Sequence, residues 1–251
     1  MTRFSQLLAV AASMALASAL PANAASAVPT KNIVLVHGAF ADGSGWRAVA
    51  DILKKDGYNV GIAQPPETSL ADDVAATNRT IDLMNGPVVL VGHSYGGVII
   101  TEAGNNPNVK TLVYVAAFQP DKGESFSALL AKIPTDSKAI KPTPDGFLYI
   151  DPAAFHADFA ADVPDETADF MARSQVFTAA KIAETTVTSP AWKSKLSFAI
   201  VATQDRTINP DLQRFMYKRS KAKVIEVTGS HAVYVSQPDA VAAFIEKAAK
   251  K

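Results

Sequence analysis

The sequence contains no cysteine among its 251 residues. A disulfide, a thiol nucleophile and a cysteine-ligated metal site are therefore excluded. An excess of either charge is also lacking, because 24 Lys and Arg residues balance 24 Asp and Glu residues without an arginine-rich run or a long acidic block. Nucleic-acid-binding proteins cluster basic residues on one face, so we expect no nucleic-acid partner.

The sequence also lacks an apolar run long enough to span a bilayer, which takes roughly 20 residues. The N-terminal apolar stretch extends only from about Leu7 to Leu20, after a single arginine and before a proline and three small residues. This layout is typical of a secretory signal peptide. We predict a signal peptide at residues 1–24, cleavage after Ala24, and a periplasmic or secreted protein without stable membrane association. A buried N-terminal helix and an uncleaved anchor are the alternatives.

Six short apolar runs rich in β-branched residues alternate with segments of helical spacing. The runs are residues 32–38, 58–63, 87–92, 111–116, 197–202 and 223–227. Their nearly continuous apolar character is typical of strands buried on both faces of a parallel sheet. The alternation of strands and helices predicts an α/β fold with about six mostly parallel strands flanked by helices. We assign residues 25–251 to one domain.

The segment from about residue 118 to residue 190 interrupts this alternation. It contains short helical patches, several prolines and scattered phenylalanines, and no clear buried strand is expected in it. Long insertions in compact domains are usually functional. We predict a helical cap over a pocket, with a surface decoration as the alternative.

The motif Gly92-x-Ser94-x-Gly96 follows the apolar run "PVVLV" and precedes a segment of helical character. This is the context of a nucleophile elbow, in which a strained turn between a strand and a helix exposes a serine. The glycines would avoid collisions with the neighbouring strand and helix. The backbone N–H of Tyr95 would lie at the helix N-terminus, where it can face an anion.

A serine nucleophile requires a base, and the chain has four histidines. His93 adjoins Ser94 and should point away from it, while His37 follows the first strand and His156 lies in the predicted cap. His231, in a loop after the last strand, has the chain position expected of the base in an elbow enzyme.

The orienting acid should lie between the serine and the base in the sequence. Asp205 comes just after a buried strand, at the sheet edge where ligands bind in open α/β folds. Its carboxylate would hold the imidazole of His231 in the required tautomer. Asp211 and Asp121 are the alternatives.

An oxyanion site completes the predicted chemistry. Its two donors are the N–H groups of Tyr95 and of Ala39, which lies in the loop after the first strand, with Phe40 as the nearest alternative to Ala39. Phe40, Phe118 and Tyr234 are predicted to line the substrate pocket; Tyr234 packing beneath His231 is an equal alternative. We predict no cofactor and no metal.

The motifs "LVHGAFADGSGW", "VGHSYGG", "ATQDRTI" and "GSHAVYVSQP" resemble those of the α/β-hydrolase superfamily over about residues 32–250. The chain is most similar to small bacterial serine esterases related to plant methylesterases and hydroxynitrile lyases. This resemblance implies a triad of Ser94, His231 and Asp205, an oxyanion hole from Ala39 and Tyr95, six parallel strands and a helical cap.

Two departures from the hydroxynitrile lyases argue against cyanohydrin cleavage. Ala232 stands where they carry lysine, and His93 stands where they tend to carry glutamate. Ser94 also argues against the haloalkane dehalogenases and epoxide hydrolases of this fold, which use an aspartate nucleophile.

The sequence thus predicts an exported serine hydrolase that cleaves small carboxylic esters through an acyl-enzyme. Perhydrolase or haloperoxidase activity and acyl transfer use the same triad and stay open. A non-catalytic ligand-binding protein is the alternative from another class.

Overall fold

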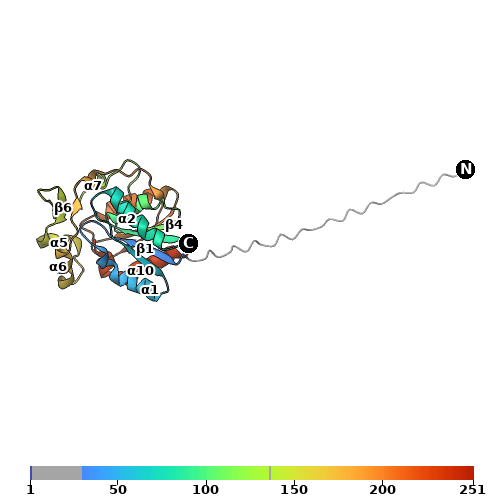
Figure 1. Ribbon diagram of the computed structural model, residues 1–251, viewed down its shortest axis with the longest axis horizontal. Coiled ribbons are helices and arrows are strands. Elements are labelled where there is room, and N and C mark those ends of the chain that lie inside the picture. Colours follow the sequence, from blue (N-terminus) through green and yellow to red (C-terminus); the bar gives the residue numbers. More distant parts are fainter. Residues whose placement is uncertain (2–29, 136) are drawn as a thin grey trace.

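The computed structural model describes residue 1, residues 30–135 and residues 137–251, and all but the first residue of the predicted signal peptide lies outside these ranges. A six-stranded parallel sheet forms the centre of the described part (Figure 1). In spatial order its strands are β2 (Asn59–Ala63), β1 (Asn32–Val36), β3 (Val88–His93), β4 (Val109–Val115), β8 (Leu196–Ala202) and β9 (Lys223–Val227). The predicted parallel sheet of six strands is confirmed.

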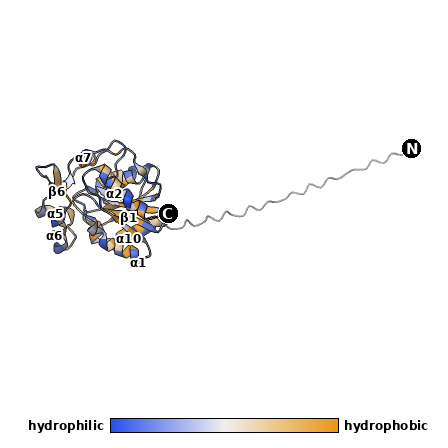
Figure 2. Ribbon diagram, viewed as in Figure 1, coloured by the Kyte–Doolittle hydropathy of each residue, from blue (hydrophilic) through white to orange (hydrophobic). Residues whose placement is uncertain are grey.

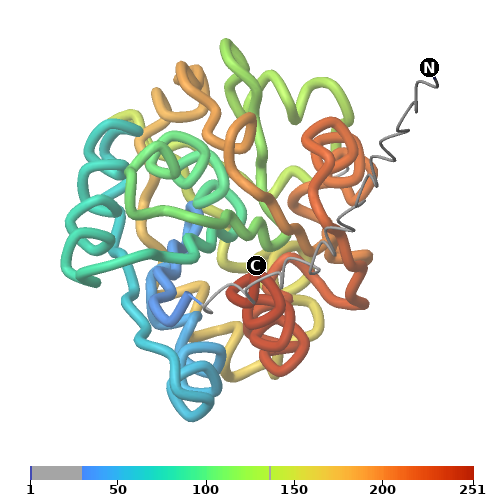
Figure 3. The backbone as a smooth tube through the Cα atoms, turned by 90° about the vertical axis from the view of Figure 1, so that its right-hand side faces the viewer, coloured from blue at the N-terminus to red at the C-terminus, as the bar shows by residue number. Residues whose placement is uncertain are grey.

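Successive residues of each central strand point to opposite faces of the sheet, so the strands feed two separate cores. Val34 and Val36 pack in the core under α2 (Leu70–Leu83), α3 (Gly96–Ala103) and α8 (Pro210–Arg219). Ile33 and Leu35 pack on the opposite face, against α1 (Arg47–Lys55) and α10 (Pro238–Ala249). Figure 3 shows α1 and α10 together on one side of the molecule. In Figure 2 the hydrophobic residues gather along the strands between these helix layers.

Two short helices and one loop lie at the carboxyl edge of the sheet. The 3₁₀ helix η1 (Gly43–Trp46) follows the loop after β1, and α9 (Val233–Ser236) follows the loop after β9. The loop after β8 ends where α8 begins at Pro210, and the side chain of Asn209 caps that helix by accepting a hydrogen bond from Asp211 N at 2.9 Å. A proline at the first helical position and an asparagine cap are both typical helix starts.

The insertion between β4 and β8 contains the expected helices and, in addition, short strands that were not predicted. Its elements are α4 (Phe126–Lys132), β5 (Ile140–Pro142), β6 (Phe147–Ile150), α5 (Pro152–Phe159), α6 (Asp165–Arg173), β7 (Thr178–Ala179), α7 (Lys181–Glu184) and η2 (Ala191–Lys193). The three strands form a small antiparallel sheet in the order β5-β6-β7. They have two to four residues each, and β5 is wholly exposed. The sequence therefore contains no long buried apolar run that would have predicted them.

Much of the insertion projects to one side of the main body (Figure 1, β6, α5 and α6). Within the described ranges, no helix is both long enough and apolar enough to cross a membrane.

Candidate active site

Ser94 occupies a strained turn between β3 and α3. Its φ is 52°, in the left-handed region that residues with a side chain seldom adopt. Hydrogen bonds on both sides hold this conformation: Ser94 N donates to Val115 O at 3.3 Å, and Ser94 O accepts from Gly97 N at 3.0 Å and Phe118 N at 3.1 Å. Strain maintained by its surroundings is common at catalytic residues. The elbow backbone predicted from the motif is therefore present.

The two motif glycines lie where a side chain would collide with backbone. A Cβ on Gly92 would lie 2.5 Å from Gly96 O, and a Cβ on Gly96 would lie 2.7 Å from the carbonyl oxygens of Val36 and His37. The close approach of β1, β3 and α3 thus requires glycine at both positions, for the reason that the sequence suggested.

Asp205 and His231, separated by 26 residues, lie side by side at the carboxyl edge of the sheet. His231 Nδ1 and Asp205 Oδ2 are 2.7 Å apart, and both side chains are buried. The other carboxylate oxygen, Oδ1, accepts from the backbone N–H groups of Thr207 and Ile208, each at 2.8 Å. With one oxygen held by the backbone, the other is fixed toward the imidazole.

Gln213, which the sequence reasoning missed, completes the shell of the acid. Its Nε2 donates to Asp205 Oδ2 at 2.8 Å and to Ile208 O at 2.9 Å, and its Oε1 accepts from Ala202 N at 3.2 Å. Gln213 is fully buried on the inner face of α8, beside Leu212. A polar residue within the apolar face of a predicted helix was the available signal.

The Nε2 atom of His231 is buried and has no hydrogen-bond partner among the described residues. The structure therefore pairs the predicted base with the predicted acid, but no hydrogen bond joins it to Ser94 within the described part. Hydrogen bonds of this kind are often long in unliganded enzymes and shorten when substrate binds. The free Nε2 is the atom that would take a proton from a serine hydroxyl.

The alternative bases and acids are occupied elsewhere. His37 Nδ1 lies 3.0 Å from Gly38 O, and His156 Nε2 lies 3.0 Å from Val163 O in the cap. Asp121 pairs with Lys193, and Asp211 pairs with Arg214. Within the described part of the chain, none of these four side chains hydrogen-bonds to Ser94, His231 or Asp205.

The side chain of His93 contacts His231 through a hydrogen bond and a ring contact. Its Nε2 donates to the backbone O of His231 at 2.9 Å, and the two ring centroids are 4.6 Å apart. Burial, followed by the nearby His231, holds the pKa of His93 well below its ordinary value, so this imidazole is neutral. The expectation that His93 points away from its neighbour and is not the base agrees with this position.

The two predicted oxyanion donors lie on adjoining loops. A Cβ on Gly38 would lie 2.5 Å from Ser94 Cβ and 3.1 Å from Tyr95 N, which shows how closely the loop after β1 approaches the elbow. Neither Ala39 N–H nor Tyr95 N–H donates a hydrogen bond to any other described residue. Free N–H groups beside a nucleophile are what a tetrahedral intermediate requires.

A buried acidic pair lies behind this oxyanion region. The Tyr95 hydroxyl donates to Asp73 Oδ2 at 2.6 Å, and Glu67 N donates to Asp73 Oδ1 at 2.7 Å. The Glu67 carboxylate accepts from the hydroxyl of Thr178 in the cap and lies 3.5 Å from His37 Nδ1. Burial raises the pKa of Glu67 and that of Asp73, partly opposed by these hydrogen bonds.

The predicted pocket residues lie in two different places. Phe40 and Phe118 are almost fully buried near the elbow, and the Phe118 ring stacks on Phe126 at 5.4 Å between centroids. Tyr234 is fully buried, with its ring 4.3 Å from that of His93 and 4.6 Å from that of Trp46. Tyr234 thus packs against His93 and Trp46, and its predicted place in the pocket or beneath His231 stays a prediction.

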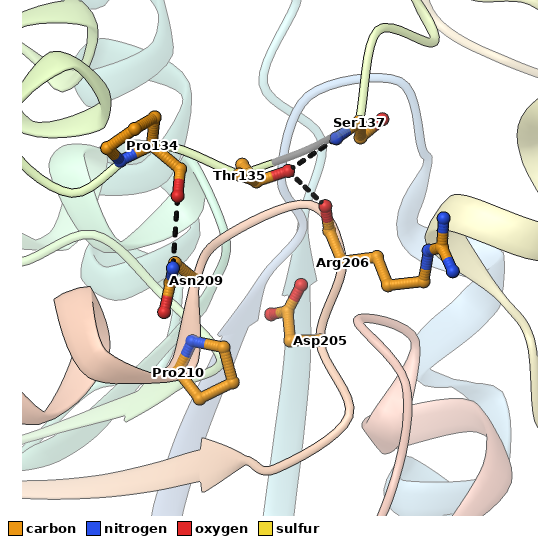
Figure 4. A pocket seen from close by; sticks show the side chains of 7 residues that line it. All are labelled: Pro134, Thr135, Ser137, Asp205, Arg206, Asn209 and Pro210. Carbon is orange, nitrogen blue, oxygen red and sulfur yellow. Dashed lines mark hydrogen bonds between the residues drawn. The ribbon is translucent and has the colours of Figure 1, made fainter.

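The site is closed in this conformation. Ser94 is 5% exposed and His231 is 0% exposed. The acid, in contrast, borders a cavity of about 270 Å³ between the cap and the loop after β8. In Figure 4 the Asp205 carboxylate lies beneath the hydrogen bond that Thr135 Oγ1 donates to Arg206 O at 2.6 Å. Within the described part, no group of three or more His, Asp or Glu side chains could hold a metal ion.

Comparison with known proteins places this geometry in a family. A model of the alpha/beta hydrolase family matches residues 33–244. The chain belongs to this family. The parallel sheet, its strand order and the elbow at Ser94 agree with this assignment.

Individual relatives refine the placement. A carbendazim-hydrolysing esterase from Nocardioides sp. is 37% identical over 116 residues, which are 40% of this chain and 48% of that protein. Methylesterase 8 of Arabidopsis thaliana is 31% identical over 117 residues, 41% of this chain and 43% of that protein. The chain thus matches about half the length of these relatives. A pyrethroid hydrolase structure from Sphingobium faniae JZ-2 has a TM-score of 0.75 at 22% identity, covering 87% of this chain and 97% of that one. The predicted resemblance to the plant methylesterase-like branch is confirmed.

Proposed function

We propose that this chain is an exported serine hydrolase that cleaves small carboxylic esters. The observation that carries the proposal is the buried hydrogen bond between Asp205 and His231, which leaves Nε2 without a partner among the described residues, in a fold whose elbow holds Ser94 at a φ of 52°. Two relatives named as esterases support the reaction class. Export rests on the N-terminal sequence alone.

The chemistry follows from these positions. Ser94 Oγ attacks the ester carbonyl while His231 Nε2 takes its proton, and Asp205 stabilises the imidazolium that forms. The N–H groups of Ala39 and Tyr95 bind the oxyanion of the tetrahedral intermediate. His231 then protonates the leaving alcohol, and the acyl group stays on Ser94. In the second half, His231 activates a water that releases the acid.

The substrate has an apolar portion in this proposal. The rings of Phe118, Phe126 and Tyr95 pack together around the elbow, with centroids 5.4 Å and 5.8 Å apart for the two pairs that include Phe126. Aromatic walls with few polar groups are typical of sites for apolar ligands.

Two measurements test the proposal. The Ser94→Ala variant should hydrolyse p-nitrophenyl esters of short acids several orders of magnitude more slowly than the wild type, with Ser44→Ala, in η1, as the matched control. A fluorophosphonate probe should label the wild type, and peptide mass mapping should locate the label on Ser94. An unlabelled folded protein, or a Ser94→Ala variant with near-normal turnover, would contradict the mechanism and favour a binding protein.

A further inference from the structure

Two consecutive cap residues, Asp158 and Phe159 at the end of α5, touch both loops that carry the acid and the base. We propose that this end of α5 is a positioning element for the pair Asp205 and His231, and a fixed part of the catalytic scaffold. The inference rests on the proposed function, because it assigns those two residues to catalysis.

Asp158 contacts the acid loop at two points and a second cap segment at a third. Its Oδ1 accepts from Arg206 Nε at 3.0 Å, and its backbone O accepts from Thr207 Oγ1 at 2.9 Å. Its Oδ2 accepts from Ser137 Oγ at 2.6 Å, which ties the contact to a second cap segment. Arg206 and Thr207 directly follow Asp205, and Thr207 N donates to the Asp205 carboxylate. A displacement of Asp158 would therefore be passed to the Asp205 carboxylate through Thr207, which hydrogen-bonds to both residues.

Phe159 holds the base loop on both sides of His231. Its backbone O accepts from Ala232 N at 2.9 Å and from Ser230 Oγ at 3.3 Å. Its ring stands nearly perpendicular to the imidazole of His231, at 77°, with the centroids 4.8 Å apart. The ring is 1% exposed, so it is packed tightly against its neighbours. The backbone contacts fix the loop, and the ring limits rotation of the imidazole.

These contacts constrain how substrate reaches the serine. Ser94 and His231 are covered, so some covering element must move. If the end of α5 moved, the acid loop and the base loop would both lose their cap contacts, and the pair would be loosened as substrate arrived. The proposal therefore places the opening motion in another part of the cap and leaves the end of α5 in place. Orientation of this kind is costly to lose, because small displacements of catalytic groups lower rates strongly.

The test compares Phe159→Leu with Phe155→Leu. Phe155 is also buried in α5, and its ring stacks on that of Phe159 at 4.8 Å, but it has no ring contact with His231. The two variants should lose similar thermal stability. Only Phe159→Leu should lower kcat, by about tenfold or more, with KM within about twofold, because positioning acts on the chemical step and not on substrate binding.

A spectroscopic measurement separates positioning from catalysis. A carboxylate-bonded imidazole proton gives a downfield proton NMR resonance, which is assigned to His231 Nδ1–H by its absence from His231→Gln. This resonance should broaden or disappear in Phe159→Leu and persist in Phe155→Leu. If Phe159→Leu does not fold, Ser230→Ala serves in its place: it removes the hydrogen bond that Ser230 Oγ donates to Phe159 O and the one that it accepts from Ala232 N.

The experiments distinguish a failure of the positioning role from a failure of the proposed function. Equal kcat values and equal resonances in the Phe159 and Phe155 variants would overturn the proposal, because the ring would then be ordinary packing. If the wild type hydrolyses no ester, the proposed function fails by itself, while the NMR comparison still decides whether α5 positions the pair.

Discussion

Gln213→Leu is the perturbation that tests the acid's environment most directly. The substitution removes one of four hydrogen bonds to the Asp205 carboxylate, since Thr207 N, Ile208 N and His231 Nδ1 remain. It also leaves the buried groups Ala202 N and Ile208 O without their glutamine partner.

The expected magnitudes follow from this count. Each buried polar group left without a partner costs about 1–3 kcal/mol, and the added apolar burial of leucine offsets part of the loss, so we expect the free energy of unfolding to fall by about 2–4 kcal/mol. For a domain of this size that lowers Tm by roughly 4–16 °C. Because the acid and base stay paired, kcat should fall about 10- to 100-fold, well short of the roughly 10⁴-fold expected when Asp205→Asn disturbs the tautomer.

The assay combines thermal unfolding with steady-state hydrolysis of a p-nitrophenyl ester. Gln204→Leu is the matched control, because Gln204 precedes Asp205 and its side chain hydrogen-bonds to no other described residue. Gln213→Glu adds a second arm: the introduced carboxyl must be protonated to donate to Asp205, so its rate relative to wild type should fall as pH rises. A Gln213→Leu variant with unchanged Tm and kcat would refute the reasoning.

Two further predictions concern the acidic pair behind the oxyanion region. Tyr95→Phe removes the hydroxyl bonded to Asp73, so urea unfolding should show a loss of about 1–3 kcal/mol, and a double-mutant cycle with Asp73→Asn should give a coupling above about 0.5 kcal/mol. Burial raises the pKa of Glu67, so its contribution to stability is greatest at low pH and is lost as pH rises through the raised value. The stability of Glu67→Gln relative to wild type should therefore increase from about pH 4 to about pH 8, and an opposite slope would show that the pKa of Glu67 is lowered instead.

The sheet and the elbow were predictable from sequence because local pattern determines them. Buried parallel strands require continuous apolar runs, and the turn at Ser94 requires glycine at 92 and 96, so both leave a signature in residue type. The position of Asp205 at the edge of the sheet was predictable for a related reason, since the carboxyl end of a strand can be read along the chain.

Gln213 and the pair Glu67 and Asp73 leave a weaker signature. Each is a buried polar residue. The hydrogen-bond partners of these side chains lie up to 111 residues away along the chain. Sequence can mark such a residue as unusual, because a buried polar group needs a hydrogen-bond partner, but it cannot name that partner. The small cap sheet was missed for another reason, because its strands have only two to four residues each and one of them is wholly exposed.

The end of α5 marks the limit of sequence reasoning. Three of its contacts with the catalytic loops use the backbone oxygens of Asp158 and Phe159, which any residue would provide, and they join positions 49 to 73 residues apart. Such a contact cannot be predicted from residue type. Only the folded structure shows that α5 lies against the loops after β8 and β9. Because these contacts join the cap to the loops of Asp205 and His231 on both sides of the site, they connect the insertion directly to the acid and the base, as the proposed positioning role of α5 requires.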